Sequence, residues 1–271
     1  MGKWNWYCPE CGFRSGKSRH IENHKKLHKR EKEYYETISK IPNIDFIPKF
    51  NIKGKLIFCL IEFRILESIK HVINSILKIY NPDDIGFAIV YGNLNKKFIE
   101  KNFSQWKNIK LLKLDFNNIN QRIYSKILKK PDFWENFTNW KHILIIQTDA
   151  LILKKIDDIY FDYEYIGAKW ADNTLKGGNG GFSLRNIQKM IEITEENRNK
   201  IFKNIPGSNE DLFFCSKKLK VIKDSLLHKR FAVEQIFYPN PIGMHGIYKI
   251  ITITDEKWKK LIEYIKKSLI N

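Results

Sequence analysis

Residues 141–153 read KHILIIQTDALIL, an apolar run that is interrupted by the polar triplet Gln147, Thr148 and Asp149. Apolar residues at nearly every position are typical of a strand that is buried on both faces of a sheet. A carboxylate directly after such a strand is costly unless it is paired, hydrogen-bonded or bound to a metal. Asp149 is therefore either a residue that stabilises a turn or part of a functional site.

Strand and helix patterns alternate on the amino-terminal side of this run. Short apolar runs occur at 55–63, 85–92 and 109–116, and each is followed by a segment with helical character, at 67–80, 95–106 and 120–130. This alternation predicts an α/β fold with a mainly parallel sheet flanked by helices.

Polar side chains follow three of the four predicted strands. Glu62 and Arg64 follow the first strand, Asn93 follows the second, and Asp149 follows the fourth. In open α/β sheets, ligands bind outside the carboxyl ends of the strands. We therefore expect these residues to face a bound ligand, with turn stabilisation as the alternative for Asp149.

The amino-terminal residues 8–28 read CPECGFRSGKSRHIENHKKLH, which has the spacing of a two-Cys, two-His zinc finger. Cys8 and Cys11 present two thiolates from one turn, and His24 and His28 lie four residues apart on one helix face. Such a site holds one Zn²⁺ and drives the folding of a small ββα module. A single finger covers about 3 bp of DNA, so a structural role or docking to protein or RNA is favoured over DNA reading.

The expected organisation is a zinc finger in 1–30, a charged helix and linker in 31–53, and a main domain in 54–271. The formal charge of +18 suits a polyanionic partner such as nucleic acid or nucleotide phosphates. Lys greatly outnumbers Arg, however, and an AT-rich genome, for example a viral one, accounts for that excess without selection for binding. No apolar run approaches the roughly 18 residues of a membrane span and no signal-peptide pattern is found, so a cytoplasmic protein is expected.

Six motifs follow one another in the second half of the chain, between residues 145 and 246: IIQTDALIL, YIGAKW, GGNGGFSLR, EDLFF, FAVE and PIGMHG. With them, the region from about 54 to 250 resembles a family of uncharacterised glycosyltransferase-like domains found in bacteria, fungi and large viruses. The resemblance implies a GT-A-like fold and the transfer of a sugar from a nucleotide-sugar donor to an acceptor.

The resemblance also implies a metal site. GT-A enzymes usually carry Asp-x-Asp after a buried strand, and this chain has Gln147 and Asp149 at those two places. A late His in a Gly-flanked segment often completes the metal site, and His245 resembles it. The resemblance therefore implies that Asp149 and His245 share a Mn²⁺ or Mg²⁺ ion at the donor diphosphate.

Two further groups of residues are candidates for the site. A glycine-rich loop lets a backbone approach a ligand or makes a tight turn, and its residues Gly178, Asn179 and Gly180 are expected to bind the donor. Glu210 and Asp211 stand at a predicted helix start, where acids are tolerated without any function. By position in the family, Asp211 is expected to be the general base on the acceptor side, with Glu210 as its catalytic neighbour.

These observations together predict a glycosyltransferase that carries a zinc finger for docking. The alternative is a non-catalytic zinc-finger protein that binds nucleic acid or a protein partner. Binding of a nucleotide sugar would favour the enzyme, and salt-sensitive binding of DNA or RNA would favour the alternative.

Overall fold

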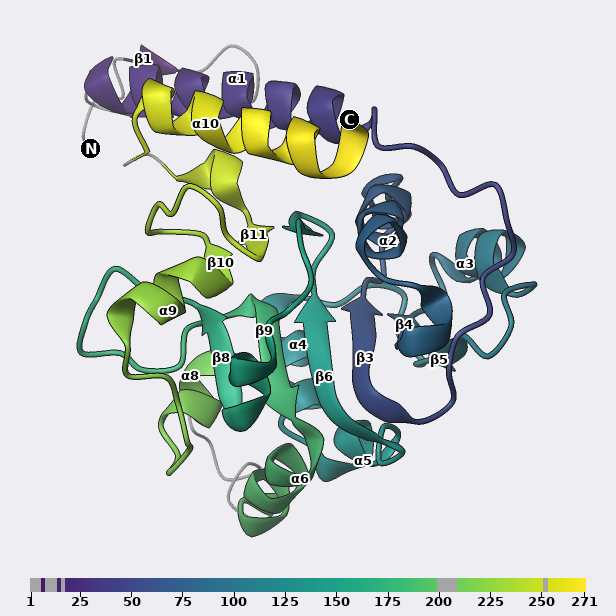
Figure 1. Cartoon of the computed structure of the whole chain (residues 1–271). Helices are drawn as coiled ribbons and strands as arrows, with labels where there is room; N and C mark the ends of the chain where they lie inside the picture. The colour runs from purple at the N-terminus through teal and green to yellow at the C-terminus, as the bar shows by residue number, and fades with distance from the viewer. Residues whose placement is uncertain (1–5, 8–13, 16–17, 199–208, 251–252) are drawn as a thin grey trace.

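A six-stranded sheet forms the centre of the molecule in the computed structural model, which describes residues 6–7, 14–15, 18–198, 209–250 and 253–271. The order of its strands is β5-β4-β3-β6-β9-β8 (Figure 1). The strands are β3 (Gly54–Ile61), β4 (Gly86–Tyr91), β5 (Lys110–Lys113), β6 (Trp140–Ile146), β8 (Tyr165–Ala168) and β9 (Asn179–Asn186). The first four are parallel to one another, whereas β9 is antiparallel to both β6 and β8. The predicted α/β fold with a mainly parallel sheet is confirmed.

The four predicted apolar runs all form strands, because helices or loops cover both faces of the sheet. Every residue of β4 is buried, as are Leu56 to Ile61 in β3. The polar triplet at 147–149 ends β6, and the chain resumes as the short strand β7 (Ala150–Ile152). The interruption of the run KHILIIQTDALIL is therefore a true strand end, and it places Asp149 at the edge of the sheet.

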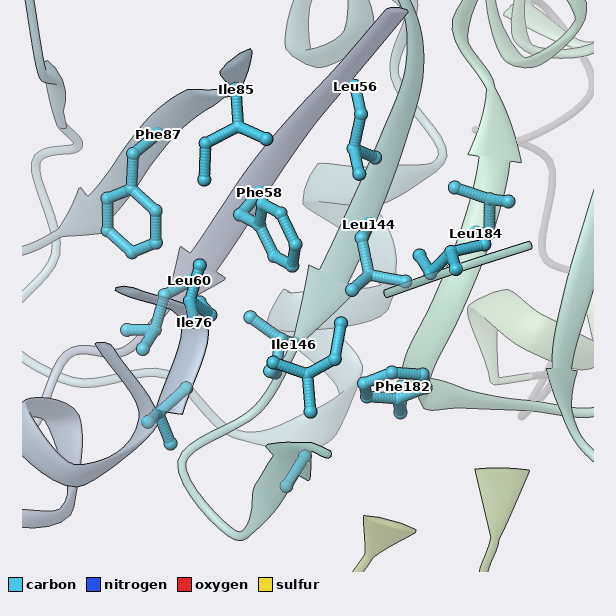
Figure 2. Close-up of a cluster of buried hydrophobic side chains, with 14 of the residues drawn as sticks. Leu56, Phe58, Leu60, Ile76, Ile85, Phe87, Leu144, Ile146, Phe182 and Leu184 are labelled. Atoms are coloured by element: carbon cyan, nitrogen blue, oxygen red, sulfur yellow. The ribbon is translucent and has the colours of Figure 1, made fainter. Parts of the chain in front are cut away.

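One face of the sheet packs against α2 (Ser68–Ile79), α3 (Lys96–Phe103) and α9 (Ser225–Phe231). Alternate residues of the strands, such as Phe58 and Leu144, point to this face (Figure 2). The helix α2 meets them with apolar residues at helical spacing, which is the reason that it forms an amphipathic helix here.

The other face packs against α4 (Gln121–Leu128), α5 (Pro131–Glu135), α6 (Ile187–Glu196) and α8 (Glu210–Cys215). The intervening strand residues, such as Cys59 and Ile145, belong to this second core. Trp134 is completely buried in it and donates a hydrogen bond from Nε1 to the carbonyl of Leu128 at 2.7 Å. Residues of each strand therefore alternate between two cores, as the pleat requires.

A small second sheet brings distant parts of the chain to the edge of the main one. In it, β7 pairs antiparallel with β11 (Gly243–His245), and β11 pairs parallel with β10 (Ala232–Val233). The register sets His245 opposite Ala150. His245, which the sequence placed between glycine-rich turns, therefore lies on a strand next to the β6–β7 turn.

Two long helices lie side by side beyond the small sheet: α1 (Ser18–Ile38) and α10 (Asp255–Ile265) (Figure 1). They enclose a third core with residues of β7, β10 and β11. Arg30 of α1 donates hydrogen bonds to the carbonyls of Ile250 and Ile253 at 3.0 and 2.7 Å and to Asp255 Oδ1 at 2.8 Å. The helix α1 is thus fixed to the main domain, and it passes without a break through the boundary expected between residues 30 and 31.

The remaining elements are short. An antiparallel pair, β1 (Trp6–Tyr7) and β2 (Arg14–Ser15), precedes α1 in the ββα order that the finger predicts. Among the residues that the structure describes, the other short elements are three 3₁₀ helices (Pro82–Asp84, Asp158–Asp162 and Ile247–Lys249) and a π-helical turn (Lys266–Ile270). Within the described ranges, no helix combines the length and apolar character needed to cross a bilayer.

Candidate active site

A cavity of about 1000 Å³ lies at the carboxyl ends of β3 and β6. Leu60 and Ile146 are partners in the register of these two strands, so the segments that follow them emerge side by side. The cavity is lined by the last residue of β3, Ile61, and the residues that follow it (Glu62, Phe63, Arg64), by the β6–β7 turn (Gln147, Thr148, Asp149), and by residues of α1, α4 and the Ile247–Lys249 turn (among them Glu31, Tyr35, Tyr124, Tyr248 and Lys249). The expected location of a ligand, outside the carboxyl ends of the strands, is therefore a real hollow.

Glu62 holds one wall of this cavity in place. Its carboxylate accepts hydrogen bonds from the Arg64 guanidinium at 2.9 and 2.7 Å, from two backbone N–H groups, and from the Thr148 hydroxyl at 3.3 Å. The Glu62 side chain is 7% exposed, whereas that of Arg64 is 57% exposed. Glu62 is therefore a positioning residue, and Arg64 is the group that it presents to the cavity.

Asp149 is the second carboxylate of the cavity with cationic partners. Its Oδ2 accepts a hydrogen bond from Lys249 Nζ at 2.5 Å, and its Oδ1 lies 3.3 Å from His245 Nε2. Burial by itself would raise the pKa of Asp149, but the hydrogen bonds and charges of His245 and Lys249 outweigh burial and hold that pKa below its usual range. Asp149 is thus ionised and paired with two cationic side chains.

His245 lies between two carboxylates. Its Nδ1 is 3.6 Å from Glu234 Oε1, while its Nε2 faces Asp149 and also Gln147 Oε1 at 3.1 Å. Burial by itself would lower the pKa of His245, but Asp149 and Glu234 raise it to about 9. The imidazole therefore carries a proton on each nitrogen at neutral pH.

The glycine-rich loop approaches side chains of the protein itself. A Cβ atom on Gly181 would lie 2.2 Å from His245 Nε2, and one on Gly180 would lie 2.2 Å from Glu210 Oε1. The Gly181 carbonyl also accepts a hydrogen bond from the backbone N–H of Gln147 at 2.9 Å. Only glycine at these two positions allows β9 to run between His245 and Glu210.

Glu210 forms a buried ion pair with Arg185. The Arg185 Nη1 and Nη2 atoms lie 2.7 and 3.1 Å from the two carboxylate oxygens, and the two side chains are 0% and 5% exposed. The guanidinium also lies over the rings of Tyr165 and Phe214. Both oxygens of Glu210 are therefore engaged inside the protein.

Asp211 is attached to the glycine-rich loop. Its Oδ2 accepts a hydrogen bond from the backbone N–H of Gly180 at 3.2 Å, and its Oδ1 accepts one from the Leu212 N–H at 2.8 Å. Through Gly180 and Gly181, Asp211 is connected to His245 and the β6–β7 turn. Among the described residues, however, Asp211 and Glu210 do not line the 1000 Å³ cavity.

The structure thus brings some of the predicted residues together and separates others. Glu62, Arg64 and Asp149 line the cavity, and His245 contacts Asp149 directly. Four other predicted donor residues lie outside the lining of that cavity: Asn93, Gly178, Asn179 and Gly180. The Asn93 side chain is exposed and donates to Asp115 Oδ1 at 2.8 Å.

Several residues of the site have no counterpart among the sequence predictions: Tyr35, Tyr124, Glu234, Tyr248 and Lys249. The sequence did contain a signal for Glu234, since it is the last residue of the FAVE motif. In the structure, Glu234 and His245 come directly after Val233 and Met244, which are partners in the paired strands β10 and β11. Tyr35 shares a helix face with Glu31, four residues earlier, and both line the cavity. The four-residue spacing predicts that the two residues share a helix face, but it does not predict which part of the protein that face covers.

Metal ligation in the described part of the chain is limited. No group of three or more His, Cys, Asp or Glu side chains in that part is arranged to hold an ion. The shared Asp149–His245 ion remains a prediction.

At the amino terminus, His24 Nε2 and His28 Nε2 lie 3.0 Å apart, whereas Cys8 and Cys11 fall outside the described residues. The zinc finger therefore also remains a prediction.

A family model described as Protein of unknown function (DUF5672) matches residues 107–245, just over half of the 271 residues. The chain belongs to this family. The match confirms the expected resemblance to a family of uncharacterised domains over residues 107–245, a region that contains Asp149, Glu210, Asp211 and His245. The strand β3 and the helix α1, which complete the cavity, lie before the matched region.

Solved structures of glycosyltransferases are among those similar to this DUF5672 protein. The apo form of the glycosyltransferase GlyE from Streptococcus pneumoniae TIGR4 matches with a TM-score of 0.48 and 13% identity, over 80% of this chain and 64% of that chain. The mannosyltransferase PcManGT from Pyrobaculum calidifontis, in complex with GDP-Man and Mn²⁺, matches with a TM-score of 0.33 and 12% identity, over 65% and 56%. TarS 1–349 from S. aureus, in complex with UDP, matches with a TM-score of 0.32 and 11% identity, over 53% and 49%. This chain thus spans less than two thirds of each of them, and no curated protein matches it in sequence.

Proposed function

We propose that this protein is a glycosyltransferase that binds a nucleotide-sugar donor in the cavity at the ends of β3 and β6. The observation that carries the proposal is the pair of exposed cations, Arg64 and Lys249, each held by a buried carboxylate at the carboxyl edge of a mainly parallel sheet. A diphosphate is the kind of anion that such a pair binds, because Arg and Lys make charge-assisted hydrogen bonds to phosphate oxygens. The six motifs that resemble GT-A-like domains support the same donor.

The proposed reaction needs a leaving group and a base. A hydroxyl oxygen of the acceptor forms a bond to the anomeric carbon of the donor sugar, while the bond from that carbon to the diphosphate oxygen breaks. The diphosphate leaves with the electron pair, and cations at the cavity stabilise its growing charge. The acceptor proton passes to a general base, for which we propose Asp211, because its oxygens accept hydrogen bonds from neutral backbone N–H groups, whereas both oxygens of Glu210 are held by the Arg185 cation.

A panel of nucleotide sugars and nucleoside diphosphates tests the donor assignment by thermal unfolding of the full chain. A ligand present at 100 times its Kd stabilises the folded state by about 2.7 kcal/mol, so at least one member is expected to raise the Tm by several degrees. Inorganic phosphate at the same concentration is the control for unspecific anion binding. The proposal is wrong if no member of the panel shifts the Tm, and salt-sensitive binding of a DNA or RNA duplex in its place would support the nucleic-acid alternative.

We also propose that Cys8, Cys11, His24 and His28 bind one structural Zn²⁺, so that the amino-terminal segment is a finger for docking. The ββα order and the convergence of the two imidazole Nε2 atoms support this assignment. Metal analysis of the purified protein is expected to find about one zinc per chain, and Cys11→Ser should lose it. Cys215→Ser, a cysteine that lies in the main domain, should keep the zinc. Equal zinc in both variants would refute the proposed ligands.

A further inference from the structure

We propose that the cavity neutralises the diphosphate of its donor with Lys249 and Arg64, and that donor binding requires no divalent cation. This inference rests on the proposed function, because it concerns how the same cavity holds the same ligand. It replaces the Mn²⁺ or Mg²⁺ ion that the family resemblance implies with a cation that belongs to the chain.

Backbone hydrogen bonds hold Lys249 in its position next to Asp149. The turn that carries it begins at Gly246, whose positive φ of 55° favours glycine. The backbone N–H of Gly246 donates to the Asp149 carbonyl at 3.0 Å, and the Lys249 N–H donates to the Gly246 carbonyl at 2.9 Å. These bonds fix the base of the Lys249 side chain beside Asp149, while its side chain remains 61% exposed in the cavity.

The cations face the cavity and their carboxylates lie behind them. The side chains of Lys249 and Arg64 are 61% and 57% exposed, against 12% for Asp149 and 7% for Glu62. Two other carboxylates line the cavity, and both have cationic or imidazole neighbours: Glu67 with Lys70 at 3.1 Å, and Glu31 with His28 at 3.9 Å. The groups best placed to meet an anion are therefore the two cations.

The donor atoms that a divalent ion would need are already engaged. Mn²⁺ and Mg²⁺ prefer carboxylate oxygens, and both oxygens of Asp149 have partners, Lys249 on one and His245 on the other. The other ring nitrogen of His245 faces Glu234. Gln147 offers a neutral amide oxygen in the place where GT-A enzymes usually have a carboxylate. The residues around Asp149 therefore suit an internal ammonium group better than a divalent ion.

The test measures the affinity of the zinc-loaded full chain for UDP and for GDP by calorimetry. Divalent cations are removed from the buffer with a chelating resin, because a soluble chelator would compete for the zinc of the proposed finger. The same titration is repeated with added Mn²⁺. The electron paramagnetic resonance signal of Mn²⁺ is compared with and without protein at the same nucleotide concentration, because the nucleotide itself binds part of the ion. We expect one of the two nucleotides to bind with the same Kd, within about threefold, in both buffers, with no further loss of the free Mn²⁺ signal when the protein is added.

Variants then assign the cation. Lys249→Ala should raise the Kd for that nucleotide about tenfold or more, the loss expected for a charge-assisted bond to phosphate, and Lys249→Arg should retain most of the affinity. Lys260→Ala is the matched control, because Lys260 is also an exposed lysine paired with a carboxylate, Glu256, but lies on α10 outside the cavity lining. Its Kd should equal that of the unmodified chain.

The outcomes separate the two proposals. Binding that appears only with Mn²⁺, together with loss of the free Mn²⁺ signal, would overturn the metal-free site and leave the proposed donor intact. Unchanged affinity in Lys249→Ala would overturn the role of Lys249. Absence of binding by either nucleotide in both buffers would overturn the metal-free site as stated, and together with the absence of a Tm shift by any member of the panel it would overturn the proposed function as well.

Discussion

Glu210→Ala is expected to lower the free energy of unfolding by about 3–5 kcal/mol, the usual cost of leaving one member of a buried ion pair without its partner. The Arg185 guanidinium is completely buried among aromatic rings, and Glu210 supplies its two carboxylate contacts. Urea unfolding of the full chain, followed by circular dichroism, measures the change.

Two controls show whether burial is the cause. Glu195→Ala breaks a similar pair with Arg198 on the surface, where the side chains are 42% and 48% exposed, and should lower the free energy of unfolding far less than Glu210→Ala does, because water solvates the remaining Arg198 guanidinium. The double variant Arg185→Met with Glu210→Leu removes both charges and should be more stable than Glu210→Ala. Equal losses in Glu210→Ala and Glu195→Ala would contradict a structural role for Glu210.

Asp211→Asn is expected to lower the rate of donor cleavage by about 100-fold or more, the usual contribution of a general base. The reaction is followed as release of nucleoside diphosphate from the nucleotide sugar that gives the largest thermal shift. Binding of that donor should be unchanged, because Asp211 lies outside the lining of the cavity. Asparagine keeps one oxygen to accept the hydrogen bond from the Leu212 N–H, so the helix start should survive.

Asp224→Asn is the matched control for this substitution. Asp224 also accepts a hydrogen bond from a backbone N–H in the first turn of a helix, that of Leu227 at 2.7 Å, but on α9. This variant should release nucleoside diphosphate at the rate of the unmodified chain. A full rate in Asp211→Asn would remove Asp211 from the mechanism, and it would leave Glu210 as the other acid of the predicted pair.

Much of the sheet was predictable because its strands are buried on both faces. The runs at 55–63 and 85–92 are apolar at nearly every position, and they correspond to β3 and β4 within two residues at each end. The direction of β9 was not predictable in the same way. It depends on hydrogen bonds to β6 and β8, and no local pattern records whether an added strand is parallel or antiparallel.

Residues of the site could be predicted where they directly follow a strand. They were harder to predict where two segments that are far apart in the sequence meet. Arg64 and Asp149 could be chosen from their positions alone, because parallel strands end at one edge of the sheet. Lys249 lies 100 residues after Asp149 in the sequence, and Tyr35 belongs to a helix with no apparent connection to the sheet. Only the packing of α1 and of the Ile247–Lys249 turn brings them to the cavity.

The unbroken helix α1 fixes both the distance and the direction between the residues that it carries. Each residue of an α-helix advances by about 1.5 Å and rotates by about 100°, so His28 and Tyr35, on the same helix, are separated by about two turns. One residue inserted between His28 and Arg30 would rotate the imidazoles of His24 and His28 by about 100° around the helix axis relative to Tyr35. Seven inserted residues would restore the direction of the imidazoles and move them about 10 Å farther along the axis. The direction of the imidazoles relative to Tyr35 is therefore set by the helix, and a change of length in this stretch alters that direction before it alters the distance appreciably.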